Sequence, residues 1–237
     1  MIDLLKVEDL VVGYYEDINI LQGVSLEAEK EDITAVLGPN GVGKSTLLKT
    51  ICGFLEATSG TINFKGDPIN GIEPHNAISK GLVYLPQELT LFHRMTVQEN
   101  LQLGGWTIRG DKELVEDRIE ENYERFPILR EKSDQHAGNL SGGQQRMVDL
   151  GRALMSNPEM LLVDEPTAGL APNLAGEMYD RLISLSEEER TILLVDQNIR
   201  KAIEVSDYIY ALELGKNKTQ GPREEFADVK EVIKDWL

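Results

Sequence analysis

Three short segments of this 237-residue chain combine side chains that suit phosphate and metal chemistry. The first is Gly38-Pro39-Asn40-Gly41-Val42-Gly43-Lys44-Ser45-Thr46, which fits the pattern G-x-x-x-x-G-K-[ST]. Its glycines allow backbone N–H groups to converge on phosphate oxygens, and the helix that follows adds its positive N-terminal end. Lys44 supplies a cation for the β- and γ-phosphates, and the Ser45 hydroxyl can ligate Mg²⁺. This segment therefore predicts a nucleotide site.

The second segment is an apolar run that ends in two carboxylates. Residues 160–163 read as a buried strand, and Asp164 and Glu165 follow it directly. A carboxylate at the carboxyl end of such a strand faces the phosphates across the sheet, so we expect Asp164 to be a magnesium ligand. Glu165 is expected to orient or deprotonate the attacking water. A D-E-P turn can also simply cap a helix, but two carboxylates in a chain with a phosphate loop favour the chemical role.

The third segment, Leu140-Ser141-Gly142-Gly143-Gln144, stands ahead of a predicted helix. A glycine pair at a helix N-terminus leaves backbone N–H groups that can bind an anion. The chain would then have two helix ends that bind phosphate. The alternative is that Ser141 and the two glycines only start the helix.

The order of the predicted elements indicates an α/β core that positions these segments. Strands are predicted at 4–14, 20–28, 32–37, 61–64, 82–85, 160–163, 191–195 and 207–213. Helices are predicted at 44–54, 97–103, 111–126, 144–155, 174–185 and 199–205, with a short one opened by Pro74. The first two strands suggest an antiparallel pair. We expect a single domain over residues 1–237, with a helical subdomain inserted near residues 90–157.

Composition limits the class of protein and its partners. The chain has 24 Lys and Arg against 41 Asp and Glu, a net charge of −17, which repels a polyanion and argues against nucleic acid as a partner. No apolar run approaches the 18 or so residues that span a bilayer, and the N-terminus lacks a basic start typical of a signal peptide. The single cysteine, Cys52, excludes an internal disulfide and fits a reducing cytosol.

The LSGGQ run between the phosphate loop and the two carboxylates resembles the signature of ATP-binding-cassette (ABC) ATPases, and the resemblance spans nearly the whole chain. It implies a P-loop NTPase core, an N-terminal antiparallel β subdomain and an α-helical insertion that carries the signature. It also implies ATP and Mg²⁺ as ligands. In this family the signature closes over nucleotide held by the phosphate loop of the other subunit, so two composite sites form in a head-to-tail dimer.

Further positions match the family by resemblance. Tyr15 aligns with the aromatic residue that stacks on adenine, and Tyr14 is the neighbouring alternative. Gln87 matches the glutamine that reaches Mg²⁺ and the attacking water. Residues 91–100 correspond to the region that receives a coupling helix from the membrane subunit. Three side chains there, Phe92, Arg94 and Met95, would suit a groove or an ordinary surface.

Two positions depart from the family pattern. Gln197 stands where most members have histidine, and Ala171 stands where aspartate is common. A glutamine amide can donate to a γ-phosphate oxygen but carries no charge, so Gln197 serves positioning better than charge stabilisation. Both departures resemble the smaller ATPase subunit of branched-chain amino-acid importers. Urea and short-amide importers share this type.

The resemblance implies an ATPase subunit at the inner face of the cell membrane, in the cytoplasm. Its partners would be integral-membrane permease subunits, a second ABC ATPase of the same or a different chain and, indirectly, a substrate-binding protein. The alternatives are a non-transport ABC ATPase acting in cofactor assembly and a regulator that binds nucleotide without hydrolysing it.

Overall fold

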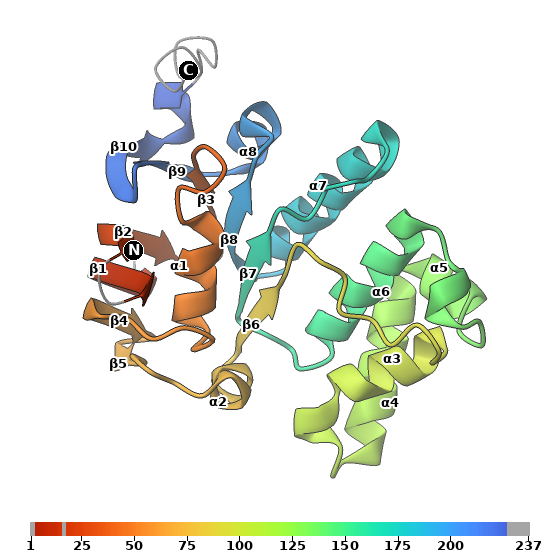
Figure 1. The fold of residues 1–237 in the computed structure, drawn as a ribbon. Coiled ribbons are helices and arrows are strands. Elements are labelled where there is room, and N and C mark those ends of the chain that lie inside the picture. Colours follow the sequence, from red (N-terminus) through yellow and green to blue (C-terminus); the bar gives the residue numbers. More distant parts are fainter. Residues whose placement is uncertain (1–2, 16–17, 227–237) are drawn as a thin grey trace.

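A computed structural model describes residues 3–15 and 18–226 of the chain, and Figure 1 shows their course. The strands form a six-stranded sheet in the order β10-β9-β3-β8-β7-β6 and a four-stranded sheet in the order β2-β1-β4-β5. The first contains β3 (Ile33–Leu37), β6 (Leu82–Leu85), β7 (Met160–Asp164), β8 (Thr191–Asp196), β9 (Tyr208–Glu213) and β10 (Lys216–Pro222). The second contains β1 (Asp3–Tyr15), β2 (Ile18–Glu29), β4 (Ser59–Phe64) and β5 (Asp67–Pro68).

The six-stranded sheet is parallel except at one edge, where β10 pairs antiparallel with β9. Strands β3, β7 and β8 are buried at every position, as expected for a sheet that is covered on both faces. Alternation along β8 divides the core in two: Ile192 and Leu194 pack with the helices, whereas Leu193 and Val195 pack with the four-stranded sheet. The sheet thus separates two apolar layers.

Eight α-helices lie within the described residues. They are α1 (Lys44–Ile51), α2 (Pro74–Ser79), α3 (Val97–Gly104), α4 (Lys112–Arg125), α5 (Pro127–Glu131), α6 (Gly142–Leu154), α7 (Pro172–Glu187) and α8 (Ile199–Val205). Short 3₁₀ turns are η1 (Trp106–Ile108), η2 (Ala137–Asn139) and η3 (Arg223–Phe226). None of these helices is both long enough and apolar enough to span a bilayer.

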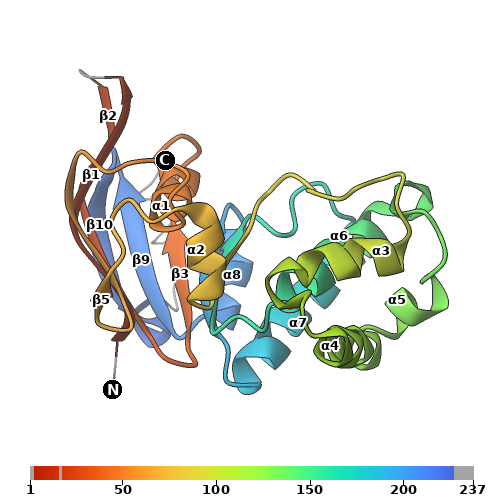
Figure 2. The same ribbon diagram turned by 90° about the horizontal axis from the view of Figure 1, so that it is seen from below.

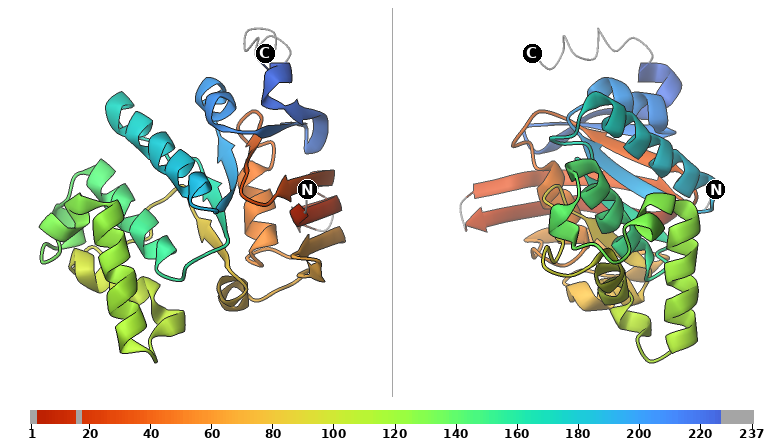
Figure 3. Two further views of the ribbon diagram at one scale, coloured as in Figure 1. Left: turned by 180° about the vertical axis from the view of Figure 1, so that it is seen from behind. Right: turned by 90° about the vertical axis from the view of Figure 1, so that its right-hand side faces the viewer.

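The helices divide into two groups in space. Helix α1 lies between the two sheets, where its Leu47, Leu48 and Ile51 are fully buried (Figures 1 and 3). Helices α3 to α6 gather on the side away from the four-stranded sheet (Figure 2). They fall within residues 90–157, and that range stays our proposed boundary for the helical subdomain.

The predicted α/β class, with an antiparallel N-terminal sheet and a helical group, is confirmed. Helix α1 is three residues shorter than predicted, because it ends at Ile51 instead of residue 54. The reason is Gly53, which has φ +78°, and whose added Cβ would lie 1.7 Å from the carbonyl oxygen of Ile72. A left-handed residue ends a helix, and this close approach needs glycine. Strand β5 and helix α5 were not predicted, because both are too short to show a period.

Helix α3 crosses α6 at a position where only glycine fits. A Cβ added at Gly104 would lie 2.3 Å from the backbone carbonyl oxygen of Arg152. Backbone atoms cannot rotate away as side-chain atoms can, so a larger residue must push the two helices apart. On helix α7, by contrast, a Cβ added at Gly176 meets nothing within 4 Å.

These two glycines give a matched stability test. We expect Gly104→Ala to lower the free energy of unfolding by about 1–3 kcal/mol through overpacking. Gly176→Ala should raise it by about 0.5–1 kcal/mol, because alanine has the higher helix propensity. Urea denaturation followed by circular dichroism measures both, and a shift in the same direction for both variants would contradict the packing of α3 on α6.

Candidate active site

The carboxyl ends of parallel strands bring the predicted site together. The phosphate loop follows β3, Asp164 ends β7, Gln197 follows β8, and Gln87 lies shortly after β6. A cavity of about 370 Å³ opens at this edge of the sheet. Its lining consists of Ile20, Asn40, Gly41, Gly43, Lys44, Ser45, Thr46, Gln87, Glu165 and Gln197. All of these except Ile20 were predicted from the sequence.

The phosphate loop has the backbone conformation that its glycines permit. Gly41 and Gly43 have φ angles of +80° and +110°. Gly43 is the N-cap of α1, and a Cβ added there would lie 2.4 Å from Cδ2 of Leu21, so a side chain at this position would have to displace Leu21. The Lys44 ammonium folds back over the loop and donates to the carbonyl oxygens of Gly38 at 2.8 Å and Pro39 at 3.2 Å.

Asp164 is held on both of its carboxylate oxygens. The Ser45 hydroxyl donates to Oδ1 at 3.0 Å, and the Tyr84 hydroxyl donates to Oδ2 at 2.8 Å. Ser45 and Asp164 therefore already meet, as expected for two groups that share one cation. Hydroxyl, carboxylate and amide oxygens are the hard ligands that Mg²⁺ prefers, so this donor set with Gln87 nearby fits magnesium.

Glu165 occupies the centre of the site in an unusual backbone conformation. Its φ is +44°, and its N–H donates to the carbonyl oxygen of Val195 at 2.8 Å. Gln87 Nε2 donates to Oε2 of Glu165 at 2.9 Å, and Gln197 Nε2 donates to the same oxygen. The other oxygen, Oε1, lies 3.9 Å from Nζ of Lys44. The two glutamines thus fix one oxygen and leave the other facing the cation.

Burial sets the electrostatics of this pair. Only 6% of Glu165 is exposed, and loss of hydration raises the pKa of its carboxyl, while the bond from Gln197 and the charge of Lys44 oppose that rise. Burial likewise lowers the pKa of Lys44, and the Glu165 and Asp164 charges act against it. The charges of Glu165 and Lys44 therefore stabilise each other. The Lys44 ammonium would already be desolvated when a phosphate enters the site.

The signature segment starts helix α6 with a capping box. The Ser141 hydroxyl accepts from the N–H of Gln144 at 3.3 Å, and the Gln144 side chain accepts from the N–H of Ser141 at 3.1 Å. A Cβ added at Gly142 would meet nothing within 4 Å, whereas Gly143 packs against Leu174. The helix start is thus observed, and none of these residues lines the cavity of its own chain. Anion binding by this segment stays a proposal.

Known proteins are similar to this chain in sequence. A family model described as ABC transporter matches residues 21–168. The chain is 41% identical over 209 residues to the high-affinity branched-chain amino acid transport ATP-binding protein BraG of Pseudomonas aeruginosa, covering 88% of each protein. It is also 41% identical over 226 residues to the probable branched-chain amino acid transport ATP-binding protein LivF of Archaeoglobus fulgidus, covering 95% of this chain and 94% of that protein.

The fold agrees with these matches. A solved ATP-binding cassette of an ABC transporter in its ADP conformation superposes with a TM-score of 0.88 at 34% identity, over 99% of this chain and 96% of that one. The chain belongs to the ABC transporter family. It is accordingly an ATPase whose hydrolysis is coupled to transport, and its predicted resemblance to the LivF type is confirmed.

The two departures from the ABC pattern have defined surroundings. Gln197 accepts from Asn40 Nδ2 at 3.5 Å while it donates to Glu165, so it links the phosphate loop to the carboxylate. Ala171 stands at the N-cap of α7, where it makes no side-chain hydrogen bond. An aspartate there could have capped the helix. The amide at position 197 thus acts through hydrogen bonds alone.

The remaining predicted ABC positions are scattered. Tyr15 ends β1, and the side chains of Tyr14 and Tyr15 lie outside the described part of the chain. Phe92 lines a cavity of about 280 Å³ between the sheet edge and α6. Met95 lines a different hollow, of about 730 Å³, between α3 and α4. Arg94 lines neither of these two cavities, so the three residues do not line one common cavity.

Two side chains beside this site, Tyr84 and Arg146, were not predicted as part of it. Tyr84 was included only as part of a strand, yet its hydroxyl holds Asp164. Its role depends on the parallel register in which Tyr84 lies beside Leu162 of β7, and a single sequence does not reveal register. Arg146, one turn into α6, contacts the backbone on both sides of Glu165. No local motif marked either residue.

Proposed function

We propose that this chain is the ATP-hydrolysing subunit of an ABC importer for branched-chain or related amino acids. The observation that carries the catalytic part is the Glu165 carboxylate, which two glutamine amides hold beside Lys44. The transported class is supported by 41% identity to BraG and LivF over most of each chain. Transport is driven by ATP-dependent closure of a dimer.

The hydrolytic step follows from the two oxygens of Glu165. Oε2 is occupied by the amides of Gln87 and Gln197, so Oε1 is the oxygen that accepts the proton of the attacking water. The water oxygen forms a bond to the γ-phosphorus, and the bond from that phosphorus to the bridging oxygen breaks, which releases ADP and phosphate. Lys44 stabilises the negative charge on the β- and γ-phosphates. Gln197 positions the carboxylate by hydrogen bonding.

Ser45, Gln87 and Asp164 are the proposed magnesium ligands. These three residues would hold Mg²⁺, and the cation would supply positive charge that neutralises the phosphates. Tyr84 orients Asp164 for this role, because its hydroxyl occupies the oxygen that Ser45 does not. The phosphate loop, Gly38 to Thr46, holds the phosphates through backbone N–H groups, and Tyr15 is the proposed adenine-stacking residue.

The signature residues act on the nucleotide of a second subunit. Ser141, Gly142, Gly143 and Gln144 are absent from the lining of this chain's own cavity, yet they present a helix N-terminus that can bind phosphate. Two chains arranged head to tail would place each signature over the other phosphate loop. The second ATPase subunit is this chain or a different ABC chain.

Trapping the closed dimer tests this arrangement. Glu165→Gln keeps the shape of the side chain but removes the carboxylate, so ATP should bind without being hydrolysed. With Mg-ATP, light scattering after size exclusion should report about twice the 26.5 kDa of one chain. The double variant, which carries Glu165→Gln together with Lys44→Ala, should keep the mass of one chain. A Glu165→Gln monomer with ATP demonstrably bound would contradict a homodimeric composite site.

The partners of the proposed importer are integral-membrane permease subunits and, through them, a substrate-binding protein; nucleic acid is not among them. The cavity that Phe92 lines also includes Tyr84, Leu85 and Pro86, which lead directly to Gln87. Phe92 and Trp106 are 53% and 60% exposed at its rim. A coupling helix of the permease seated there would touch the segment that reaches the γ-phosphate. The chain would then lie in the cytoplasm at the inner face of the membrane.

Uptake measurements test the transported class. Cells that lack this gene should take up radiolabelled leucine, isoleucine or valine at least about tenfold more slowly than cells that carry it. The wild-type gene should restore uptake, and Glu165→Gln should not. Labelled urea is the comparison substrate. Unchanged branched-chain uptake, or a defect in urea uptake alone, would contradict the proposed substrate class.

A further inference from the structure

Helix α6 buries a single arginine against the site. Arg146 lies little more than one turn beyond Ser141 and is 3% exposed. All three of its guanidinium nitrogens point at backbone carbonyl oxygens: Nε to Pro166 at 3.0 Å, Nη1 to Pro86 at 2.8 Å and Nη2 to Asp164 at 3.5 Å. One side chain therefore joins the signature helix to the ends of strands β6 and β7.

These three carbonyls border the catalytic residues. Pro86 directly precedes Gln87, and Asp164 and Pro166 stand on either side of Glu165. The left-handed φ of Glu165, +44°, is an unfavourable conformation for a non-glycine residue and persists only where its surroundings fix it. Arg146 supplies such a constraint, because it binds the carbonyl oxygens of the residues directly before and directly after Glu165.

A buried partner keeps the guanidinium charged and in place. Burial lowers the pKa of Arg146, and the carboxylate of Asp149, 3.4 Å from Nη1, raises it. Asp149 is itself only 1% exposed, and its other oxygen accepts from the Thr90 hydroxyl at 2.9 Å and from Arg152 at 3.0 Å. Hydrogen bonds from a charged donor are roughly twice as strong as those from a neutral donor, so the guanidinium holds its carbonyl partners firmly.

The geometry requires arginine rather than any cation. The guanidinium spreads its donors over three nitrogens in one plane, so it can bond carbonyls on different segments at once. A lysine ammonium is a single nitrogen and would reach only part of this set. Lysine at position 146 would keep the ion pair with Asp149 and lose the bridge between the strand ends.

We propose that Arg146 is a positioning residue for hydrolysis, which fixes Glu165 and Gln87 relative to helix α6. A displacement of the signature segment, at the start of that helix, would then shift the hydrolytic carboxylate of the same subunit. The inference rests on the proposed function, because it takes Glu165 as the residue that activates water. The inference adds to that function a direct connection, through Arg146, between the signature segment and the Glu165 carboxylate of the same chain.

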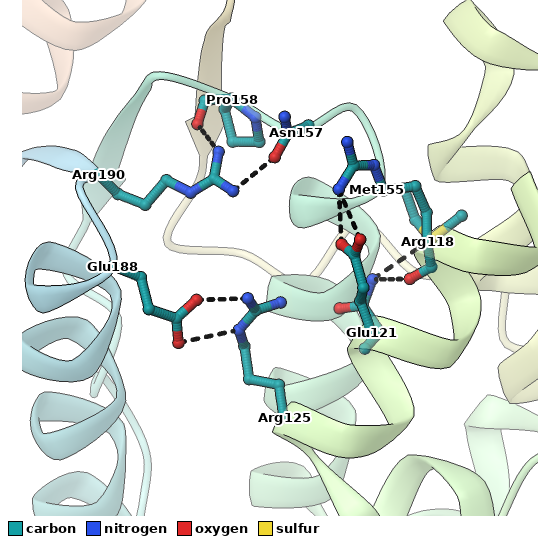
Figure 4. Close-up of polar contacts among 9 residues, drawn as sticks. Arg118, Glu121, Arg125, Met155, Asn157, Pro158, Glu188 and Arg190 are labelled. Atoms are coloured by element: carbon teal, nitrogen blue, oxygen red, sulfur yellow. Dashed lines mark hydrogen bonds and ion pairs between the residues drawn. The ribbon is translucent and has the colours of Figure 1, made fainter. Parts of the chain in front are cut away.

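A second arginine at the other end of β7 provides a matched control. Arg190 also donates to backbone and amide oxygens, those of Pro158 and Asn157 (Figure 4). Pro158 precedes β7, whereas the Arg146 contacts lie at its carboxyl end. The five residues of β7 separate the two clusters by about 15 Å. Arg190→Lys therefore makes the same chemical change to an arginine that holds carbonyls but does not border the site.

The experiment compares ATPase kinetics with ATP affinity. We expect Arg146→Lys to lower kcat about 10- to 100-fold, because a misplacement of about 1 Å can cost this much. Its ATP affinity, measured without hydrolysis in EDTA with a fluorescent nucleotide, should stay within about threefold of wild type. Arg190→Lys should keep kcat within about twofold. Arg146→Gln, with an amide of shorter reach, is measured alongside in case the lysine variant fails to fold.

The measured kcat values distinguish the two proposals. A fall in kcat confined to Arg146 variants, at preserved ATP affinity and with a folded near-UV spectrum, supports the proposal. Unchanged kcat in a folded Arg146 variant, or equal losses in Arg146→Lys and Arg190→Lys, overturns it. Wild-type turnover in Glu165→Gln, run in the same series, overturns the proposed function itself, so the two failures are distinguishable.

Discussion

Glu165 keeps its carboxylate inside the protein, with 6% of the residue exposed, where loss of hydration disfavours the charged form. An isolated charge there would be costly, so the residue needs donors. Gln87 and Gln197 supply two on one oxygen, and Lys44 faces the other. If both oxygens accepted hydrogen bonds, neither would be available to accept a proton. Here Oε2 is held by the two amides, whereas Oε1 faces the Lys44 ammonium, which phosphate can also bind. The site depends on that asymmetry.

The fold meets this requirement by bringing several strand ends to one edge. Parallel β3, β7 and β8 deliver the phosphate loop, Glu165 and Gln197 without long side-chain reach. Buried polar links then join the loops: the Tyr179 hydroxyl donates to Asp196 at 2.8 Å and lies 3.2 Å from the Thr167 hydroxyl. Asp196 directly precedes Gln197, so helix α7 ties the loop after β7 to the loop after β8. Satisfied buried networks of this kind make a site rigid.

Local sequence patterns predicted much of this site, because many of its functional residues are contiguous in the sequence. The phosphate loop and the Asp164-Glu165 pair need only a strand before them, and the apolar runs indicated those strands. Tyr84 was not predicted, because its role depends on strand register. Arg146 was missed because its three carbonyl partners come from two distant segments. Ser141 and Gln144 fit the sequence pattern of a capping box, and the structure shows that they form one. From the sequence, the start of a helix was predicted at this point, but not the capping box.

The titration of Glu165 tests most directly whether its carboxylate is desolvated at the centre of the site. In protein labelled with ¹³C-glutamate, the side-chain carbonyl signal that disappears in Glu165→Gln can be followed with pH in the nucleotide-free state. Burial raises the pKa of this carboxyl, so we predict protonation at a pH above its ordinary 4.5, where exposed glutamates are still ionised. Gln197→Ala should raise the midpoint further, since the bond from Gln197 lowers it. A midpoint at or below that of the exposed glutamates would contradict a desolvated carboxylate at the centre of the site.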